Sequence, residues 1–106
     1  MHENYIVFKN WTTTHRIAFE SILYVAVNGH YCQVVTSNLV YSIKCSLMEL
    51  LERAACNYLT RVHRSFAVNM QQVTGINRRE LYIRTHRIPL SRAHSKEVME
   101  LFFNST

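Results

Sequence analysis

The sequence of 106 residues contains no aspartate, only two glycines and only one proline. Because glycine and proline are scarce, the loops must be short or built from Asn, Ser and Thr. A hydrolase or nuclease needs a nucleophile beside a base, or carboxylates that hold a metal ion. Glu49, Glu52, Glu97 and Glu100 instead recur three residues apart on two amphipathic segments, as solvated helix faces do. No glycine-rich phosphate loop is present, so the sequence does not predict an enzyme.

Cysteine usage argues against a disulfide framework. The three cysteines, Cys32, Cys45 and Cys56, are odd in number and form no Cys-x-x-Cys motif. Cys32 and Cys45 lie among apolar, strand-like residues and Cys56 at a predicted helix end, which favours small buried side chains in a reducing cytosol. A redox switch stays open as an alternative.

Long apolar segments are also missing. No run approaches the length of about 18 residues that a membrane span needs, and the start of the chain does not read as a signal peptide. We therefore expect a cytoplasmic protein that has no membrane partner. No residues stand at the spacing of a metal site, His63 included, and no cofactor is expected.

Positive charge is concentrated in one part of the chain. The whole sequence has 12 Lys and Arg against 7 acidic residues, a net charge of +5. Within residues 61–96 only Glu80 opposes eight basic side chains, which are Arg61, Arg64, Arg78, Arg79, Arg84, Arg87, Arg92 and Lys96. This asymmetry predicts a face that binds a polyanion, with a generic basic surface as the alternative.

Short strand-like segments dominate the pattern. Runs of β-branched and aromatic residues between turn residues predict strands at 5–9, 15–19, 21–27, 31–36, 39–44, 59–63, 65–68, 73–76, 80–84 and 87–90. A single turn is predicted at 69–72. Because Pro89 cannot donate to a strand ladder, the last strand should lie at a sheet edge. Trp11, Tyr31, Tyr41 and Tyr82 are predicted to be core or half-buried.

Two helices complete the prediction. Ser46-Leu-Met-Glu49 is a capping box, so a helix should span about residues 47–56. Ser91 is expected to cap a second helix that runs to about Phe103 and turns Val98, Leu101 and Phe102 to the core. Many short strands and two helices predict one mostly-β, antiparallel domain over residues 1–106.

Two arginine-containing motifs carry the functional prediction. The first is Leu59-Thr-Arg-Val-His-Arg-Ser-Phe-Ala-Val-Asn69, and the second is Ile88-Pro-Leu-Ser-Arg92. The planar guanidinium of arginine matches the acceptors of guanine edges and phosphates. The paired motifs resemble the signature of the LytTR family of bacterial DNA-binding domains, which are the output modules of response regulators. The resemblance runs from about Ile17 to Phe103.

This resemblance implies an elongated stack of small antiparallel sheets with two short helices. It implies that loops at the sheet ends, not an inserted helix, contact double-stranded DNA carrying tandem direct repeats. Two copies, forming a dimer on DNA, would bind there about one helical turn apart. The chain holds no receiver domain, so that domain or another regulatory protein would lie outside this chain. The alternative from another class is a module whose basic face binds an acidic protein, and RNA is a weaker third because no aromatic stacking platform is evident.

Three residues are expected to read bases. Arg92 begins the last helix, where a cation opposes the helix dipole, so a structural sequence would favour an acid there. Arg64 shares a strand face with Val62, and only a turn at Arg64 would release it to the surface. His30 follows the Asn28-Gly29 turn, at a loop position where the family often carries histidine. The resemblance also implies that His63 fixes its own loop by a hydrogen bond.

Further basic residues are predicted to contact phosphates, which position DNA without reading its sequence. They are Lys44, Arg78, Arg79, Arg84, His86, Arg87 and Lys96. The sequence departs from the family pattern in one hairpin. Where many members carry Asn-Gly or Asp-Gly, Thr85 and His86 stand here, and neither residue favours a positive φ as glycine does.

Overall fold

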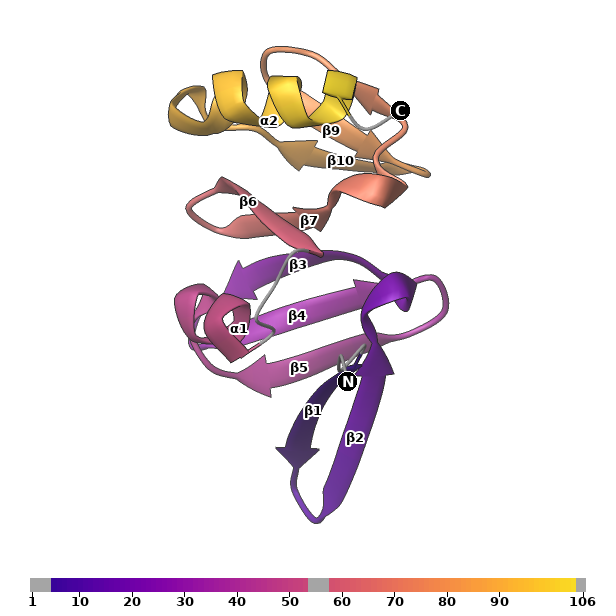
Figure 1. Ribbon diagram of the computed structural model, residues 1–106. Helices are drawn as coiled ribbons and strands as arrows, with labels where there is room; N and C mark the ends of the chain where they lie inside the picture. Colours follow the sequence, from indigo (N-terminus) through magenta and orange to yellow (C-terminus); the bar gives the residue numbers. More distant parts are fainter. Residues whose placement is uncertain (1–4, 54–57, 105–106) are drawn as a thin grey trace.

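Three antiparallel sheets and two α-helices form the protein, for which a computed structural model describes residues 5–53 and 58–104 (Figure 1). The first sheet consists of β1 (Tyr5–Asn10) and β2 (Thr13–Ala18). The second has the order β5-β4-β3-β7-β6 and consists of β3 (Ile22–Asn28), β4 (Tyr31–Thr36), β5 (Val40–Lys44), β6 (Leu59–His63) and β7 (Phe66–Asn69). The third has the order β10-β9-β8 and consists of β8 (Gly75–Ile76), β9 (Glu80–Ile83) and β10 (His86–Pro89). The predicted mostly-β class is confirmed, and the strand with Pro89 is an edge strand as predicted.

The helices and short 3-10 turns connect these sheets. They are η1 (Phe19–Ser21), α1 (Leu47–Arg53), η2 (Met70–Gln72) and α2 (Arg92–Asn104). The predicted capping box starts α1: Ser46 Oγ accepts from the Glu49 amide at 3.1 Å, and Glu49 Oε1 accepts from the Ser46 amide at 3.4 Å. The predicted end of this helix, and Cys56 with it, falls on residues 54–57, outside the described residues.

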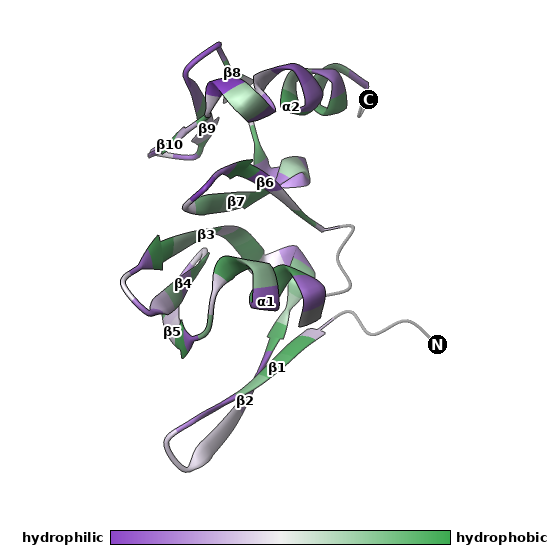
Figure 2. Cartoon of the chain, turned by 90° about the vertical axis from the view of Figure 1, so that its left-hand side faces the viewer, coloured by the Kyte–Doolittle hydropathy of each residue, from purple (hydrophilic) through white to green (hydrophobic). Residues whose placement is uncertain are grey.

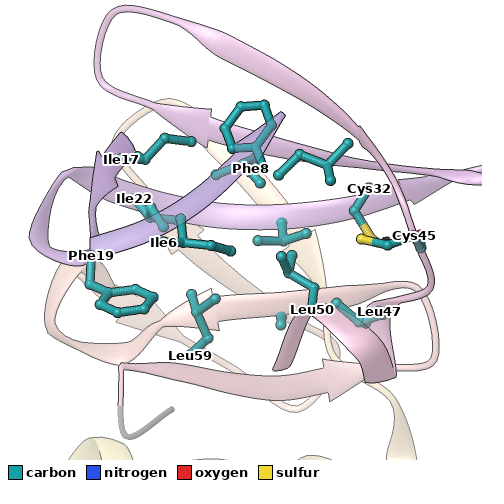
Figure 3. Packing of buried hydrophobic residues seen from close by; sticks show 14 residues of the cluster. Ile6, Phe8, Ile17, Phe19, Ile22, Cys32, Cys45, Leu47, Leu50 and Leu59 are labelled. Atoms are coloured by element: carbon teal, nitrogen blue, oxygen red, sulfur yellow. Dashed lines mark hydrogen bonds between the residues drawn. The ribbon is translucent and has the colours of Figure 1, made fainter. Parts of the chain in front are cut away.

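The five-stranded sheet lies in the middle of the stack and is buried on both faces. One face packs with the β1–β2 hairpin and α1 into a cluster whose members include Ile6, Phe8 and Leu50 (Figure 3). The other face packs with β8–β10 and α2 into a second cluster. Adjacent residues on β4 serve opposite sides, because Val34 belongs to the first cluster and Val35 to the second. Stacking the layers gives a long axis of 42 Å against 33 and 25 Å.

Three hairpins have two-residue turns that begin with a residue of positive φ. The residues are Trp11 (φ 58°), Gly29 (φ 63°) and Arg84 (φ 54°). Glycine adopts this conformation without penalty, whereas a side chain costs about 1–2 kcal/mol. The expected turn at Thr85-His86 is wrong by one residue: His86 pairs with Ile83, so Arg84 and Thr85 form the turn.

Three other expectations about burial are wrong. Trp11 is 91% exposed because it belongs to a turn. Tyr31 is 47% exposed because it begins β4, where its side chain lies on the opposite face of the strand from that of the buried Cys32. Leu101 is 41% exposed, since α2 presents Val98 and Phe102 to the core instead. Tyr41 and Tyr82 are half-buried, as predicted.

Candidate nucleic-acid interface

The three predicted base-reading residues lie at the ends of three different structural elements. His30 is the second residue of the β3–β4 turn, Arg64 is the first residue of the β6–β7 turn, and Arg92 is the first residue of α2. All three side chains are exposed. These three segments lie on the same side of the stack, at the left in Figure 1, and Figure 2 looks onto that side. They follow one another along the long axis, with the β3–β4 turn nearest the β1–β2 hairpin.

Backbone hydrogen bonds connect the three segments. The Val27 amide donates to the Ser65 carbonyl at 2.8 Å, which joins the end of β3 to the β6–β7 turn. The Ser91 amide donates to the Val62 carbonyl at 2.9 Å, which joins the end of β6 to the start of α2. The segments therefore hold a fixed spacing, as loops that recognise a rigid partner need.

The β6–β7 turn shows how Arg64 reaches the surface. A bulge lies between Arg61 and His63, Val62 is fully buried, and β6 ends at His63, so Arg64 leaves the strand and is exposed. His63 Nδ1 accepts from the Ser65 amide at 3.1 Å, so this imidazole braces the turn as expected.

Arg61 also braces this turn, a role that the sequence did not reveal. Its Nε donates to the carbonyl of His63 at 3.3 Å, and its Nη2 donates to the carbonyl of Arg64 at 2.7 Å. Its strand position alone gave no sign of this role, because the carbonyls that it binds come close only after the chain has turned.

The charges at the start of α2 favour the binding of an anion. Its first turn contains no acidic residue, and Arg92 adds a cation to the positive end of the helix. The hydroxyl of Ser91 lies 2.6 Å from Nδ1 of His94, which ties the residue before the helix to its first turn. The positive end of a helix with a guanidinium beside it forms a favourable place for a phosphate or a base edge.

The loop between β8 and β9 adds Arg78 and Arg79 to the same end of the three-stranded sheet. Asn77 Oδ1 accepts from the amides of Arg79 at 2.8 Å and Glu80 at 3.0 Å, which fixes a tight turn. The carbonyl of Arg79 accepts from the Leu90 amide at 2.8 Å, two residues before Arg92. Both arginine side chains are exposed.

Glu80, the acid that follows these arginines, is engaged elsewhere. Its carboxylate accepts a hydrogen bond from the Tyr82 hydroxyl. That bond, with lesser effects of burial and of the Glu80 charge, raises the pKa of Tyr82 above its usual value. The carboxylate of Glu80 is therefore bound by the tyrosine on the same strand.

The other predicted phosphate contacts lie at different places in the fold. Lys44 ends β5 opposite Tyr31, beside the His30 turn, and Lys96 is exposed on α2. Arg84 and His86 lie at the opposite end of the three-stranded sheet, because β10 runs from His86 toward the start of α2. There His86 Nδ1 lies 3.3 Å from the hydroxyl of Tyr24, whose pKa is raised by burial. Arg87 is exposed in the middle of β10.

The described cysteines are structural. Cys32 and Cys45 are buried, and the Cys32 thiol donates to the Cys45 carbonyl at 3.3 Å. Burial, reinforced by Cys45 and Glu49, raises the pKa of Cys32 to about 12. No cluster of three or more His, Cys or Glu that could hold a metal ion occurs within residues 5–53 and 58–104. In the same part of the chain, neither helix has the length and apolar character needed to cross a bilayer.

Exposed basic residues lie on two turns and at a helix start, in segments on one side of the stacked sheets, and this arrangement is typical of a nucleic-acid-binding domain. Comparison with known families gives this class its name. The chain belongs to the LytTR family, whose DNA-binding domain model matches residues 12–103.

A solved structure has the same fold. It is the LytTR DNA-binding domain of a Bacillus cereus protein described as a methyl-accepting/DNA response regulator. The TM-score is 0.77 at 20% sequence identity, with 97% of this chain and 99% of that chain covered. No curated protein sequence matches the chain.

Proposed function

We propose that the protein binds double-stranded DNA sequence-specifically and regulates transcription by inserting His30, Arg64 and Arg92 into successive grooves. The observation that carries this proposal is that the three segments bearing these exposed residues lie on one side of the stack and are joined by backbone hydrogen bonds. A rigid row of donors matches a rigid duplex because little conformational freedom is lost on binding.

The three residues have different chemical tasks. Arg64 and Arg92 each offer two parallel donors to O6 and N7 of guanine, a contact that discriminates against other bases by about 1–3 kcal/mol. His30 donates or accepts one hydrogen bond, which gives weaker discrimination. None of these tasks involves bond cleavage, so the protein acts as a binding domain and not as an enzyme.

Phosphate contacts supply most of the affinity. Lys44, Arg78, Arg79 and Lys96 lie on or near the same side and are the first candidates, with Arg87 next to them in rank. Arg84 and His86 are ranked last because they lie at the opposite end of their sheet. Each phosphate contact releases counterions, so binding should weaken steeply with salt.

The family resemblance supports a proposal for the arrangement on DNA. We propose that two copies bind tandem direct repeats about one helical turn apart, as a dimer formed on DNA. The domain would act in the bacterial cytoplasm, either as the output of a two-component response regulator or as a stand-alone regulator. In both cases a receiver domain or another regulatory protein outside this chain would supply the input signal.

Selection from a random duplex library at moderate salt tests the proposal. Enrichment of a tandem repeat is expected, and Arg92→Ala should then weaken binding to that repeat far more than to scrambled DNA. Arg84→Ala is the matched control, since it removes the same type of exposed side chain at the far end of the sheet. Retention of DNA without enrichment would reduce the function to polyanion binding. Absence of retention would favour an acidic protein as the partner.

A further inference from the structure

The tip of the β1–β2 hairpin carries an aromatic side chain where local structure does not favour one. Trp11 begins the two-residue turn with φ 58° and is 91% exposed, the most exposed of the described large apolar side chains. Glycine or asparagine is the usual residue at such a position. A large apolar residue that is both exposed and conformationally strained marks a contact site more often than a structural position.

The surroundings of Trp11 are basic and rich in hydroxyl groups. No acidic residue occurs between Glu3 and Glu20, whereas Lys9 and Arg16 lie on the outer face of the hairpin. Three consecutive threonines, at 12–14, follow Trp11, and all three are exposed. Lysine, arginine and threonine side chains are the usual donors to phosphate oxygens.

The hairpin is held firmly on the stack. Ile6, Phe8 and Ile17 on its inner face are buried in the core cluster beneath α1. Phe8 stacks on His15 at 5.1 Å and meets Tyr41 of β5 edge-on at 5.7 Å between ring centroids. The base of the β1–β2 hairpin is therefore fixed, while the tip of the hairpin projects beyond the five-stranded sheet.

The position of the tip continues the proposed interface. Along the long axis the hairpin follows the β3–β4 turn that carries His30, at the end of the stack opposite α2 (Figure 1). The tip is set back from the side on which the three reading segments lie (Figure 1). Strands of six residues extend about 20 Å, or roughly six base pairs of duplex. A duplex that curves toward the hairpin would therefore meet the tip just outside the site.

We propose that the β1–β2 tip binds the duplex flanking the site on the His30 side, with Trp11 against the minor groove and Lys9 and the threonines on phosphates. This inference rests on the proposed function. Apolar side chains inserted at a base step favour curved DNA, and the basic outer face supports the same curvature by attracting the phosphates.

Affinity on three duplexes tests the inference: the selected site alone, the site lengthened on one side, and the site lengthened on the other. His30→Ala should relax the base preference at certain positions of the selected site, and the end of the site nearest those positions is the His30 side. Trp11→Asn is the test variant, because asparagine tolerates positive φ and should preserve the turn. Phe103→Ala, which removes a 65% exposed aromatic side chain at the opposite end, is the control.

Trp11→Asn should weaken binding at least about fivefold on the duplex lengthened on the His30 side and leave the other two affinities unchanged. It should also reduce the curvature of that duplex, measured by end-to-end fluorescence transfer. Equal affinities for wild type and variant on all three duplexes would overturn the inference. A loss seen only when a second site is present would overturn it too, in favour of contact between copies. Failure of the wild type to bind the site alone would refute the proposed function itself.

Discussion

The guanidinium of Arg61 donates to the backbone carbonyl of Arg64 at 2.7 Å, so one arginine holds the peptide that presents another. The same side chain also donates to the carbonyl of His63. The half-buried Arg61 thus acts as a positioning residue for the exposed Arg64. A turn held in this way loses less freedom when it enters a groove.

Arg61→Ala should weaken binding to the selected site about fivefold, because charge-assisted hydrogen bonds contribute roughly 1–3 kcal/mol and this pair is only partly shielded from water. In an Arg64→Ala background the same change should have almost no further effect. A double-mutant cycle of equilibrium affinities measures this coupling. Arg61→Lys retains the charge but not the planar guanidinium with its several donors, so it should recover only part of the lost affinity. Additive losses would show that Arg61 contacts DNA by itself.

Arg78→Ala and Arg79→Ala should weaken binding to all sequences alike. If each side chain contacts one phosphate, each change should lower the slope of log K against log salt by about 1. Titrations of selected and scrambled duplexes from low to moderate salt give this slope. Arg84→Ala should change the slope least, because Arg84 lies at the opposite end of the sheet. A slope unaffected by Arg78→Ala and Arg79→Ala would place the β8–β9 loop away from the DNA backbone.

Asn69→Ala should lower the free energy of unfolding by about 1–3 kcal/mol. Asn69 is 1% exposed, its Nδ2 donates to the Ile22 carbonyl at 3.0 Å, and its Oδ1 accepts from the Gln71 amide at 3.1 Å. Alanine would leave the Ile22 carbonyl without this donor and remove the cap of η2. Urea unfolding measures the change, with the exposed Asn104→Ala as control. Equal stability of the two variants would contradict this structural role.

Cys32 should resist alkylation in the folded protein at pH 8. Only the thiolate reacts, and burial raises the pKa of Cys32 from 9.0 to about 12. Iodoacetamide labelling followed by mass spectrometry, with urea-unfolded protein as the positive control, measures the protection. Rapid labelling of Cys32 in folded protein would contradict a closed core at this position.

The same raised pKa predicts a dependence of stability on pH. The folded state holds the Cys32 proton more tightly than the unfolded chain does, so this stabilisation is complete below pH 9 and is lost as pH rises toward 12. Between these values the free energy of unfolding of the wild type should fall more steeply than that of Cys32→Val. Parallel curves would show that the thiol keeps its proton equally well in both states.

Much of the local structure was predictable from the sequence because its causes lie within a few residues. The capping box needs only Ser46 and the amide of Glu49, and both of its hydrogen bonds form. Most strands followed from apolar alternation. Errors arose at strand ends, where the turn at Arg84 replaced the one expected at Thr85-His86. At a strand end, a shift of the pairing register by one residue changes which residues form the turn. The energy of that shift depends on all the residue pairs of the two strands.

The candidate site was predictable only as a set of residues. The motifs identified Arg64 and Arg92, and the requirement that a turn free Arg64 from the face of Val62 is met. That Arg78 and Arg79 lie near them, while Arg84 and His86 lie at the other end of the sheet, follows from the direction of β10, which no local pattern specifies. The bracing by Arg61 was not predictable for the same reason.

By itself, the sequence determined that this chain forms many short strands and two helices, and that its basic motifs belong to a LytTR domain. These properties depend on side-chain type and on spacing over a few residues. The tertiary structure alone decided which strand ends meet on one side, and that Trp11, in the loop between the first two predicted strands, is exposed instead of packed in the core. Both outcomes depend on contacts between residues far apart in the chain, because the packing of the sheets as a whole selects one pairing order among many that the local pattern allows.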